Sequence, residues 1–197
     1  MKKYHKNILV TGGAGYIGSC LITFLKKKFN VYVVDNLSIG KKSQIKSKFF
    51  YKINLSNRTE LDKFLKQKKF DAVIHLAAHS NLKKKIKNPK LFYKNNFIAT
   101  KNLIDLMIKY KIKKIIFSST ASVYGEPKKV PIYETNKCLP ISIYGKTKLL
   151  SENYIKKKSK YNFKYIIFRY FNVAGSIYKS NLGETKNPPE HLIPIIF

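Results

Sequence analysis

The chain has 197 residues, enough for one sizeable hydrophobic core and the beginning of a second lobe. Its formal net charge of +30 comes almost entirely from lysine, since Arg58 and Arg169 are the only arginines among 40 basic residues, which argues against specific nucleic-acid recognition. Two cysteines and the lack of an apolar run near the roughly 20 residues of a membrane span argue against a disulfide framework and a membrane protein, so we expect a cytoplasmic location.

The N-terminal region combines a strand, a glycine-rich turn, a helix and a second strand. Ile8–Val10 predict a short buried strand, and Thr11–Gly18 follow at once. Apolar residues then recur at helical spacing as far as Leu25, Val31–Val34 predict the next strand, and Asp35 closes it. In such a βαβ unit, glycines let the backbone approach a pyrophosphate whose charge lies at a helix N-terminus.

The spacing of Gly12, Gly15 and Gly18 is GxxGxxG rather than GxGxxG. Asp35 lies 23 positions after Gly12, close to the place of an acid that binds the ribose (roughly 20 residues on). Ordinary turn glycines are the alternative interpretation. The strand, the helix and the acid together favour dinucleotide binding.

Further strands and helices alternate along the chain, and irregular sequence begins at Asn172. The expected strands are Phe49–Ile53, Ala72–Leu76, Ile115–Phe117 and Tyr165–Phe171, and the expected helices run through Lys66 after a cap at Ser56 or Asn57, from Pro89 to about Tyr110, and from Ile143 to about Lys158. Near-continuous apolar strands separated by helices predict an α/β fold, a Rossmann-type doubly wound parallel sheet with helices on both faces.

Small or polar residues stand where each expected strand ends. Ligands of such sheets bind outside the carboxyl ends of the strands, so we expect these residues to line one crevice. They are Gly12, Asp35, Asn54, Ala77, Ser118–Thr120 and Asn172.

Tyr144 and Lys148 are four residues apart and therefore neighbours on one helical face. Lowering a tyrosine pKa from about 10 to about 7 requires roughly 4 kcal/mol, which one ammonium at about 4 Å supplies at an effective dielectric constant near 20. The pair is therefore sufficient for general-base chemistry at neutral pH, although tyrosine and lysine are so common here that a chance match is the alternative. Thr120 is a candidate for binding a substrate hydroxyl or the phenolate, with a loop cap as the alternative.

Five stretches carry a resemblance to a known family: Thr11–Gly18, Asp35–Leu37, Phe117–Pro127, Tyr144–Lys148 and Arg169–Asn172. On these motifs the chain resembles the extended short-chain dehydrogenases/reductases, and within them the UDP-glucose 4-epimerase family. The resemblance extends over nearly the whole chain.

The resemblance implies tightly held NAD rather than NADP, in agreement with an acid at Asp35 that would repel a 2′-phosphate. It implies that Tyr144 takes the proton of the 4-hydroxyl of a UDP-sugar while hydride passes from carbon 4 to the nicotinamide. The keto-sugar then turns over and receives the hydride on its other face. Lys148 would hold the nicotinamide ribose and Thr120 the substrate hydroxyl, and no metal is implied.

The family's binding residues carry over position by position. The expected cofactor contacts are Gly12, Gly15, Tyr16, Ile17, Gly18, Asp35, Asn36, Asn54, Leu55, Leu76, Ala77, Ala78, Asn95, Ser118, Tyr144, Lys148 and Phe171. The expected substrate contacts are Thr120, Tyr144, Asn172 and His191. Alternatives remain for three of them: Phe171 as a core residue, Asn95 as a polar helix residue and His191 as a solvated histidine.

The chain departs from the family pattern in three places. Asn54 replaces the usual aspartate that faces adenine, and His79 with Ser80 replaces a basic residue that some members use. Family members also continue beyond the position of Phe197 into a lobe that completes the uridine-diphosphate site. We therefore expect an NAD-binding domain over residues 1–172, an incomplete substrate lobe over residues 173–197, and a truncated chain whose activity is in question.

Other interpretations stay open. Another nucleotide-sugar epimerase or a decarboxylase shares the same motifs, an NAD-binding fragment without turnover belongs to a different class, and a polyanion-binding lysine surface belongs to a third. A dehydratase is disfavoured, because Ala121 and Ser122 stand where it would need an Asp-Glu pair. The resemblance also raises a homodimer formed through the long helices.

Overall fold

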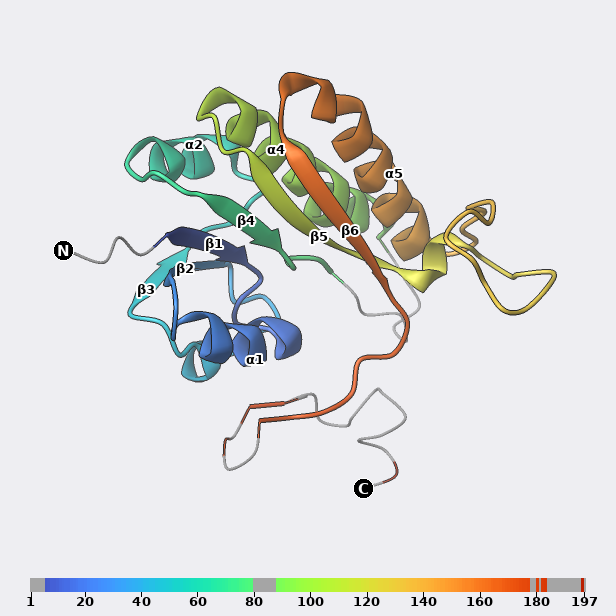
Figure 1. Cartoon of the computed structure of the whole chain (residues 1–197), viewed down its shortest axis with the longest axis horizontal. Coiled ribbons are helices and arrows are strands. Elements are labelled where there is room, and N and C mark those ends of the chain that lie inside the picture. Colours follow the sequence, from blue (N-terminus) through green and yellow to red (C-terminus); the bar gives the residue numbers. More distant parts are fainter. Residues whose placement is uncertain (1–5, 80–87, 178–179, 181, 184–195, 197) are drawn as a thin grey trace.

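One sheet of six parallel strands forms the centre of the molecule (Figure 1). The computed structural model describes residues 6–79, 88–177, 180, 182–183 and 196. The strand order is β3-β2-β1-β4-β5-β6, which confirms the predicted doubly wound sheet. Strands are added in one direction from β1 to β3 and in the other from β4 to β6, so the switch point lies between β1 and β4. The strands are β1 (Asn7–Thr11), β2 (Asn30–Asp35), β3 (Phe49–Lys52), β4 (Ala72–His75), β5 (Lys114–Thr120) and β6 (Lys164–Tyr170).

Helices cover both faces of this sheet (Figure 1). The helix α1 (Tyr16–Leu25) lies on one face, and α2 (Arg58–Lys66), α4 (Ala99–Lys109) and α5 (Ile143–Lys158) lie on the other. Successive side chains of a strand point to opposite faces, so Ile8 and Val10 belong to the core under α1 while Leu9 belongs to the core under α2 and α4.

Side-chain caps explain where α2 and α5 begin. Asn57 accepts a hydrogen bond from the backbone N–H of Glu60 and starts α2, and Ser142 accepts one from Gly145 and starts α5. The expected long helix from Pro89 is built from three consecutive segments: α3 (Pro89–Phe92), the π-helical η2 (Tyr93–Ile98) and α4. Such π segments are frequent at functional sites.

Several expected strand boundaries differ from the structure, and the end of β5 differs most. β5 extends through Ser118 to Thr120, which we expected to follow the strand, because β6 pairs with it residue by residue as far as Thr120 opposite Tyr170. The stretch expected as a loop after Asp35 contains a single 3-10 turn, η1 (Lys42–Gln44). Two further short 3-10 turns are η3 (Ala121–Val123) and η4 (Ser159–Tyr161).

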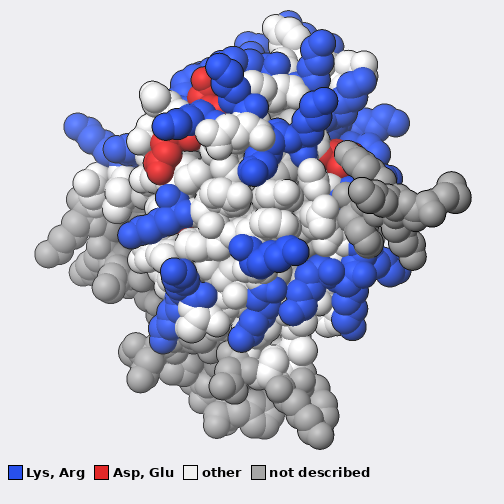
Figure 2. All heavy atoms as spheres, turned by 90° about the vertical axis from the view of Figure 1, so that its left-hand side faces the viewer, with Lys and Arg blue, Asp and Glu red and all other residues white. Residues whose placement is uncertain are grey.

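Lysine side chains are spread over the face at the amino ends of the strands, with uncharged surface between them (Figure 2). This face is opposite the carboxyl ends of the strands. In the part of the chain that the structure describes, no helix has both the length and the apolar character needed to cross a lipid bilayer.

Candidate active site

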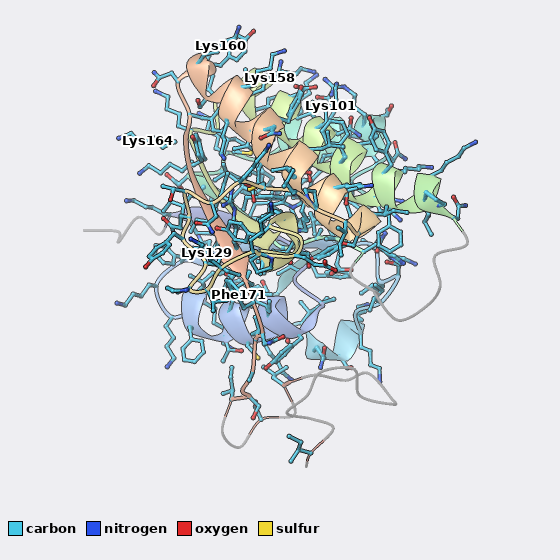
Figure 3. All side chains as sticks on the ribbon, turned by 90° about the vertical axis from the view of Figure 1, so that its right-hand side faces the viewer. Lys101, Lys129, Lys158, Lys160, Lys164 and Phe171 are labelled. Carbon is cyan, nitrogen blue, oxygen red and sulfur yellow. The ribbon has the colours of Figure 1, made fainter. Side chains whose placement is uncertain are left out.

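A cavity of about 750 Å³ lies at the carboxyl ends of the strands, at the topological switch point between β1 and β4. Figure 3 faces this side of the molecule and shows Phe171 where the chain leaves β6. The cavity is lined by 18 of the residues expected to bind cofactor or substrate: Gly12, Gly15, Tyr16, Ile17, Gly18, Asp35, Asn36, Asn54, Leu55, Leu76, Ala77, Ala78, Asn95, Ser118, Thr120, Tyr144, Phe171 and Asn172. Phe171 is not a core residue, because 63% of it is exposed.

Two predicted site residues are not among those that line the cavity. Lys148 is buried behind Tyr144, with 2% of its surface exposed. His191 lies outside the described residues.

Two glycines of the turn have no room for a side chain, Gly12 because of the residues that follow β4 and Gly18 because of the turn itself. Gly12 has φ +74°, and a Cβ on it would lie 2.5 Å from the backbone nitrogen of Ala77. A Cβ on Gly18 would lie 2.4 Å from the carbonyl oxygen of Gly12. The turn therefore brings the start of α1 against the end of β4.

The same turn suits the pyrophosphate of a dinucleotide. Gly15 is the N-cap of α1 and has no side chain to accept from the first-turn N–H groups. A Cβ there would meet only the Gly12 carbonyl oxygen, at 3.4 Å, so an anion can approach. Helix N-termini of this kind bind phosphate through their N–H groups and their dipole. Within the described ranges, no three His, Cys, Asp or Glu side chains gather as metal ligands would.

Asp35 is held rigidly beside this turn. Its Oδ1 accepts a hydrogen bond of 2.8 Å from the backbone of Leu37, and its Oδ2 accepts one of 3.0 Å from the backbone of Ala14. Each carboxylate oxygen keeps a further lone pair, so the group remains able to accept from a ribose hydroxyl. Its negative charge disfavours a 2′-phosphate at the same place.

Tyr144 and Thr120 face each other in the cavity wall. Burial raises the pKa of the Tyr144 phenol, and a hydrogen bond with Thr120 acts in the opposite direction. The spacing of Tyr144 and Lys148 predicts a lowered tyrosine pKa, and the structure shows a raised one. Desolvation disfavours the phenolate more strongly than the neighbouring groups favour it. The Thr120 hydroxyl also accepts a hydrogen bond from the backbone of Ser122, so it caps η3 as well as facing the phenol.

Lys148 is fixed between α5 and β5. Its amine donates a hydrogen bond of 2.5 Å to the carbonyl oxygen of Ser118 and lies 4.8 Å from the ring centre of Phe117 and 5.8 Å from that of Tyr144. Burial lowers the pKa of Lys148 to about 7, and the charge of Glu152 opposes this shift. The lysine therefore titrates in the range in which an acid–base pair works at neutral pH.

Two buried residues that the sequence analysis did not single out support the site. Asn96 accepts a 2.7 Å hydrogen bond from the backbone N–H of His79, and its amide donates to the His79 carbonyl and to the hydroxyl of Thr147 on α5. It thereby ties the segment after β4 to the helix that carries Tyr144. Glu152 is completely buried and bound by Arg169. Its position four residues after Lys148 was the available sequence signal.

His75 is a third such residue, and its contacts define its tautomer. The Thr100 hydroxyl donates to the backbone carbonyl of Asn96 at 2.6 Å, so it accepts from Nε2 of His75 at 2.8 Å. Nδ1 then accepts from the hydroxyl of Thr11 at 2.6 Å. Burial, together with the charge of Lys148, lowers the pKa of His75 to about 3, so the ring is neutral.

Comparison with known proteins gives a consistent result. The family model described as "NAD dependent epimerase/dehydratase family" matches residues 8–196. The UDP-glucose 4-epimerase of Halalkalibacterium halodurans is 41% identical over 191 residues, which are 96% of this chain and 57% of that protein. The chain thus spans little more than half the length of this relative.

Two solved structures are similar over nearly the whole chain. The UDP-glucose 4-epimerase from Brucella ovis in complex with NAD has a TM-score of 0.90 and 34% identity, and the match covers 96% of this chain and 59% of that one. The UDP-N-acetylglucosamine 4-epimerase from Methanobrevibacter ruminantium, in complex with UDP-N-acetylmuramic acid, has a TM-score of 0.83 and 34% identity, with 98% and 61% covered.

Proposed function

The chain belongs to the NAD dependent epimerase/dehydratase family, and on that premise we propose that the whole protein is an NAD-dependent UDP-glucose 4-epimerase. One observation carries the proposal: the glycine turn of α1 and the phenol of Tyr144 line the same cavity. The relatives named above support the choice of substrate class.

When bound, NAD supplies a reversible hydride acceptor for carbon 4 of the sugar. The N-terminus of α1 would hold the pyrophosphate, and Asp35 would accept from a hydroxyl of the adenosine ribose. Asn54 and Leu55, which follow β3 and line the cavity, would face the adenine, while Asn95 and Ser118, which also line it, would face the nicotinamide.

Tyr144 is the base in this proposal. It accepts the proton of the sugar 4-hydroxyl as carbon 4 is oxidised and returns it when carbon 4 is reduced from the other face. Lys148, as an ammonium, stabilises the phenolate across the face of α5, and Thr120 binds the reacting hydroxyl. Because burial raises the pKa of Tyr144, the Lys148 ammonium and the positive charge of bound oxidised nicotinamide would together lower that pKa for the base role.

Phe171, Asn172 and His191 are the proposed contacts to the nucleotide sugar. Residues 1–172 would form the dinucleotide-binding and catalytic part, and residues 173–197 would begin the substrate lobe. An N-acetylated UDP-sugar is the second candidate substrate, because one of the similar structures is a UDP-N-acetylglucosamine 4-epimerase.

We also propose a homodimer that pairs through the long helices. Tyr93 on η2 and Leu150 on α5 are large apolar residues with 45% and 42% of their surface exposed. Light scattering after size exclusion would give twice the mass of one chain.

Cys20 and Cys138 are both free thiols, which supports a reducing compartment such as the cytoplasm.

The proposed activity is tested by incubating the purified protein with NAD and UDP-galactose, without added reductant, and separating the products. Formation of UDP-glucose that depends on NAD is the expected result. Tight NAD binding without product from any UDP-hexose or its N-acetylated form would leave a binding module and contradict the proposal.

A further inference from the structure

The face of α5 that packs on the sheet carries three ionisable residues one turn apart. Tyr144, Lys148 and Glu152 follow each other at spacings of four, so their side chains form one row. Figure 1 shows α5 lying across the end of the sheet formed by β5 and β6. The proposed function uses the first two residues of the row and gives no role to the third.

Glu152 is the most completely enclosed charge of the row, with 0% of its surface exposed. Arg169 on β6 binds both carboxylate oxygens, through Nε to Oε1 at 3.1 Å and through an Nη to Oε2 at 2.7 Å. Ser119 on β5 donates its hydroxyl to Oε1, and Lys156 lies 3.7 Å from Oε2. The carboxylate therefore joins α5 to the two last strands of the sheet.

This anchor lies next to the backbone that holds the lysine. Ser118, whose carbonyl oxygen accepts from Lys148, directly precedes Ser119, which donates to Glu152. Thr120 follows and faces the phenol of Tyr144. Three successive residues of β5 thus contact three successive members of the α5 row.

We propose that Glu152 is a positioning residue for Lys148: its ion pair with Arg169 and its hydrogen bond from Ser119 hold α5 on β5, and its negative charge keeps the buried amine an ammonium. The inference rests on the proposed function, in which Lys148 serves Tyr144. Glu152 touches neither the cavity nor the reacting atoms.

The groups around Lys148 agree with this role. Tyr144 and Glu152 act on it from α5. The Phe117 ring and the Ser118 carbonyl contact it from β5, and neutral His75 is near it on β4. Arg169 on β6 and Lys156 on α5 act on it through Glu152. Among these groups Glu152 carries the negative charge at neutral pH, since the Arg169 guanidinium and the Ser119 hydroxyl lower the pKa of its carboxyl against the effect of burial.

The test is the titration of Lys148, followed by NMR of lysine labelled with ¹³C at Cε. A Lys148→Met variant identifies the resonance by its disappearance. In Glu152→Gln we expect the midpoint of Lys148, about 7 in the unchanged chain, to fall by about one pH unit or more. Lys156→Gln is the matched control, because it removes a half-exposed charge one turn further along α5, and it should not lower the midpoint.

The direction of the shift separates the two roles that Glu152 could have. A residue that only packed the helix would, when replaced, let water reach Lys148, and its midpoint would rise toward the value of about 10.4 for a hydrated lysine. A fall shows the loss of a stabilising negative charge. An unchanged or raised midpoint in a folded Glu152→Gln variant overturns the inference.

Replacing Glu152 alone leaves the Arg169 guanidinium without its carboxylate partner, and such an unpaired buried charge prevents folding in some proteins. Glu152→Gln combined with Arg169→Met removes both charges, and here too the midpoint of Lys148 should fall. The measurement needs no substrate. A fallen midpoint in a protein that binds NAD but converts no UDP-sugar would therefore support this inference while contradicting the proposed function.

Discussion

The amine of Lys148 is bound to the backbone carbonyl of Ser118 at 2.5 Å, two residues before Thr120 on the same strand. This bond fixes the distance between the helix that carries Tyr144 and the strand that carries its hydroxyl partner. The phenol, the hydroxyl and the amine are therefore positioned by secondary structure rather than by loops, which is the arrangement that preorganised sites need.

Replacing Tyr144 by Phe should abolish turnover of any UDP-sugar and leave NAD binding unchanged. The ring keeps its packing, but the proton of the sugar hydroxyl has no acceptor, and loss of a general base typically costs about 10²- to 10⁴-fold in rate. Turnover and NAD affinity, measured by product analysis and calorimetry, check the prediction. Tyr133→Phe is the matched control, because Tyr133 is 63% exposed. Retained turnover in Tyr144→Phe would refute the base assignment.

Replacing Asp35 by Asn should weaken NAD about tenfold or more, since a charge-assisted hydrogen bond to the ribose is lost. The preference for NAD over NADP should also shrink, because the repulsion of a 2′-phosphate disappears. Asp71→Asn is the control: Asp71 accepts from the backbone of Asn7 at the opposite end of the strands. Calorimetric titration with both nucleotides measures these affinities. Equal NAD affinities of Asp35→Asn and the unchanged chain would contradict the proposed contact between Asp35 and the ribose.

His75 should make the protein less stable in acid. Its pKa of about 3 in the folded protein lies below the value of about 6.5 in an unfolded chain, so between these values the unfolded state binds the extra proton. The stability due to the neutral ring is complete above about pH 6.5 and is lost as pH falls toward 3.

His75→Gln tests this in urea unfolding, because an amide can still accept from Thr11 and donate to Thr100. The advantage of the unchanged protein over the variant should be about 2 kcal/mol smaller at pH 5 than at pH 7.5. If the free energies of unfolding of the two proteins changed in parallel over that pH range, the assignment of a neutral buried His75 would be wrong.

Replacing Gln44 by Leu should stabilise the protein. Gln44 is 5% exposed, and within the described structure neither atom of its side-chain amide has a hydrogen-bond partner. Such buried groups cost about 1–3 kcal/mol each, so the free energy of unfolding should rise by about that amount in the absence of ligand. Gln67→Leu, on the surface after α2, should change it by less than about 0.5 kcal/mol. A loss of stability in Gln44→Leu would contradict the prediction.

The doubly wound parallel sheet and the place of the cavity could be predicted from the sequence because both follow from local patterns. Apolar runs identify the strands, and parallel strands place their carboxyl ends together, so the residues after each run, such as Asp35 and Asn54, had to meet. The glycine spacing added the turn that presents the start of α1.

The buried polar contacts could not be predicted, because they join residues far apart in sequence. The pairing of Glu152 with Arg169 and Ser119 depends on how α5 lies on the sheet, and so does the burial of Lys148 behind Tyr144 rather than in the cavity wall. The same burial raises the pKa of Tyr144, although the four-residue spacing is sufficient to lower it. Spacing shows which residues share a face and not how far water is excluded from it.

The central claim is that one dinucleotide lies along the cavity, with its adenine near Asn54 and its nicotinamide near Tyr144. Isotope-filtered nuclear Overhauser spectra of the labelled protein with unlabelled NAD measure this directly. The account predicts contacts from the nicotinamide protons to the ring of Tyr144 and from the adenine protons to Leu55. Bound NAD that contacts neither residue, or contacts them in the reverse order, would contradict it.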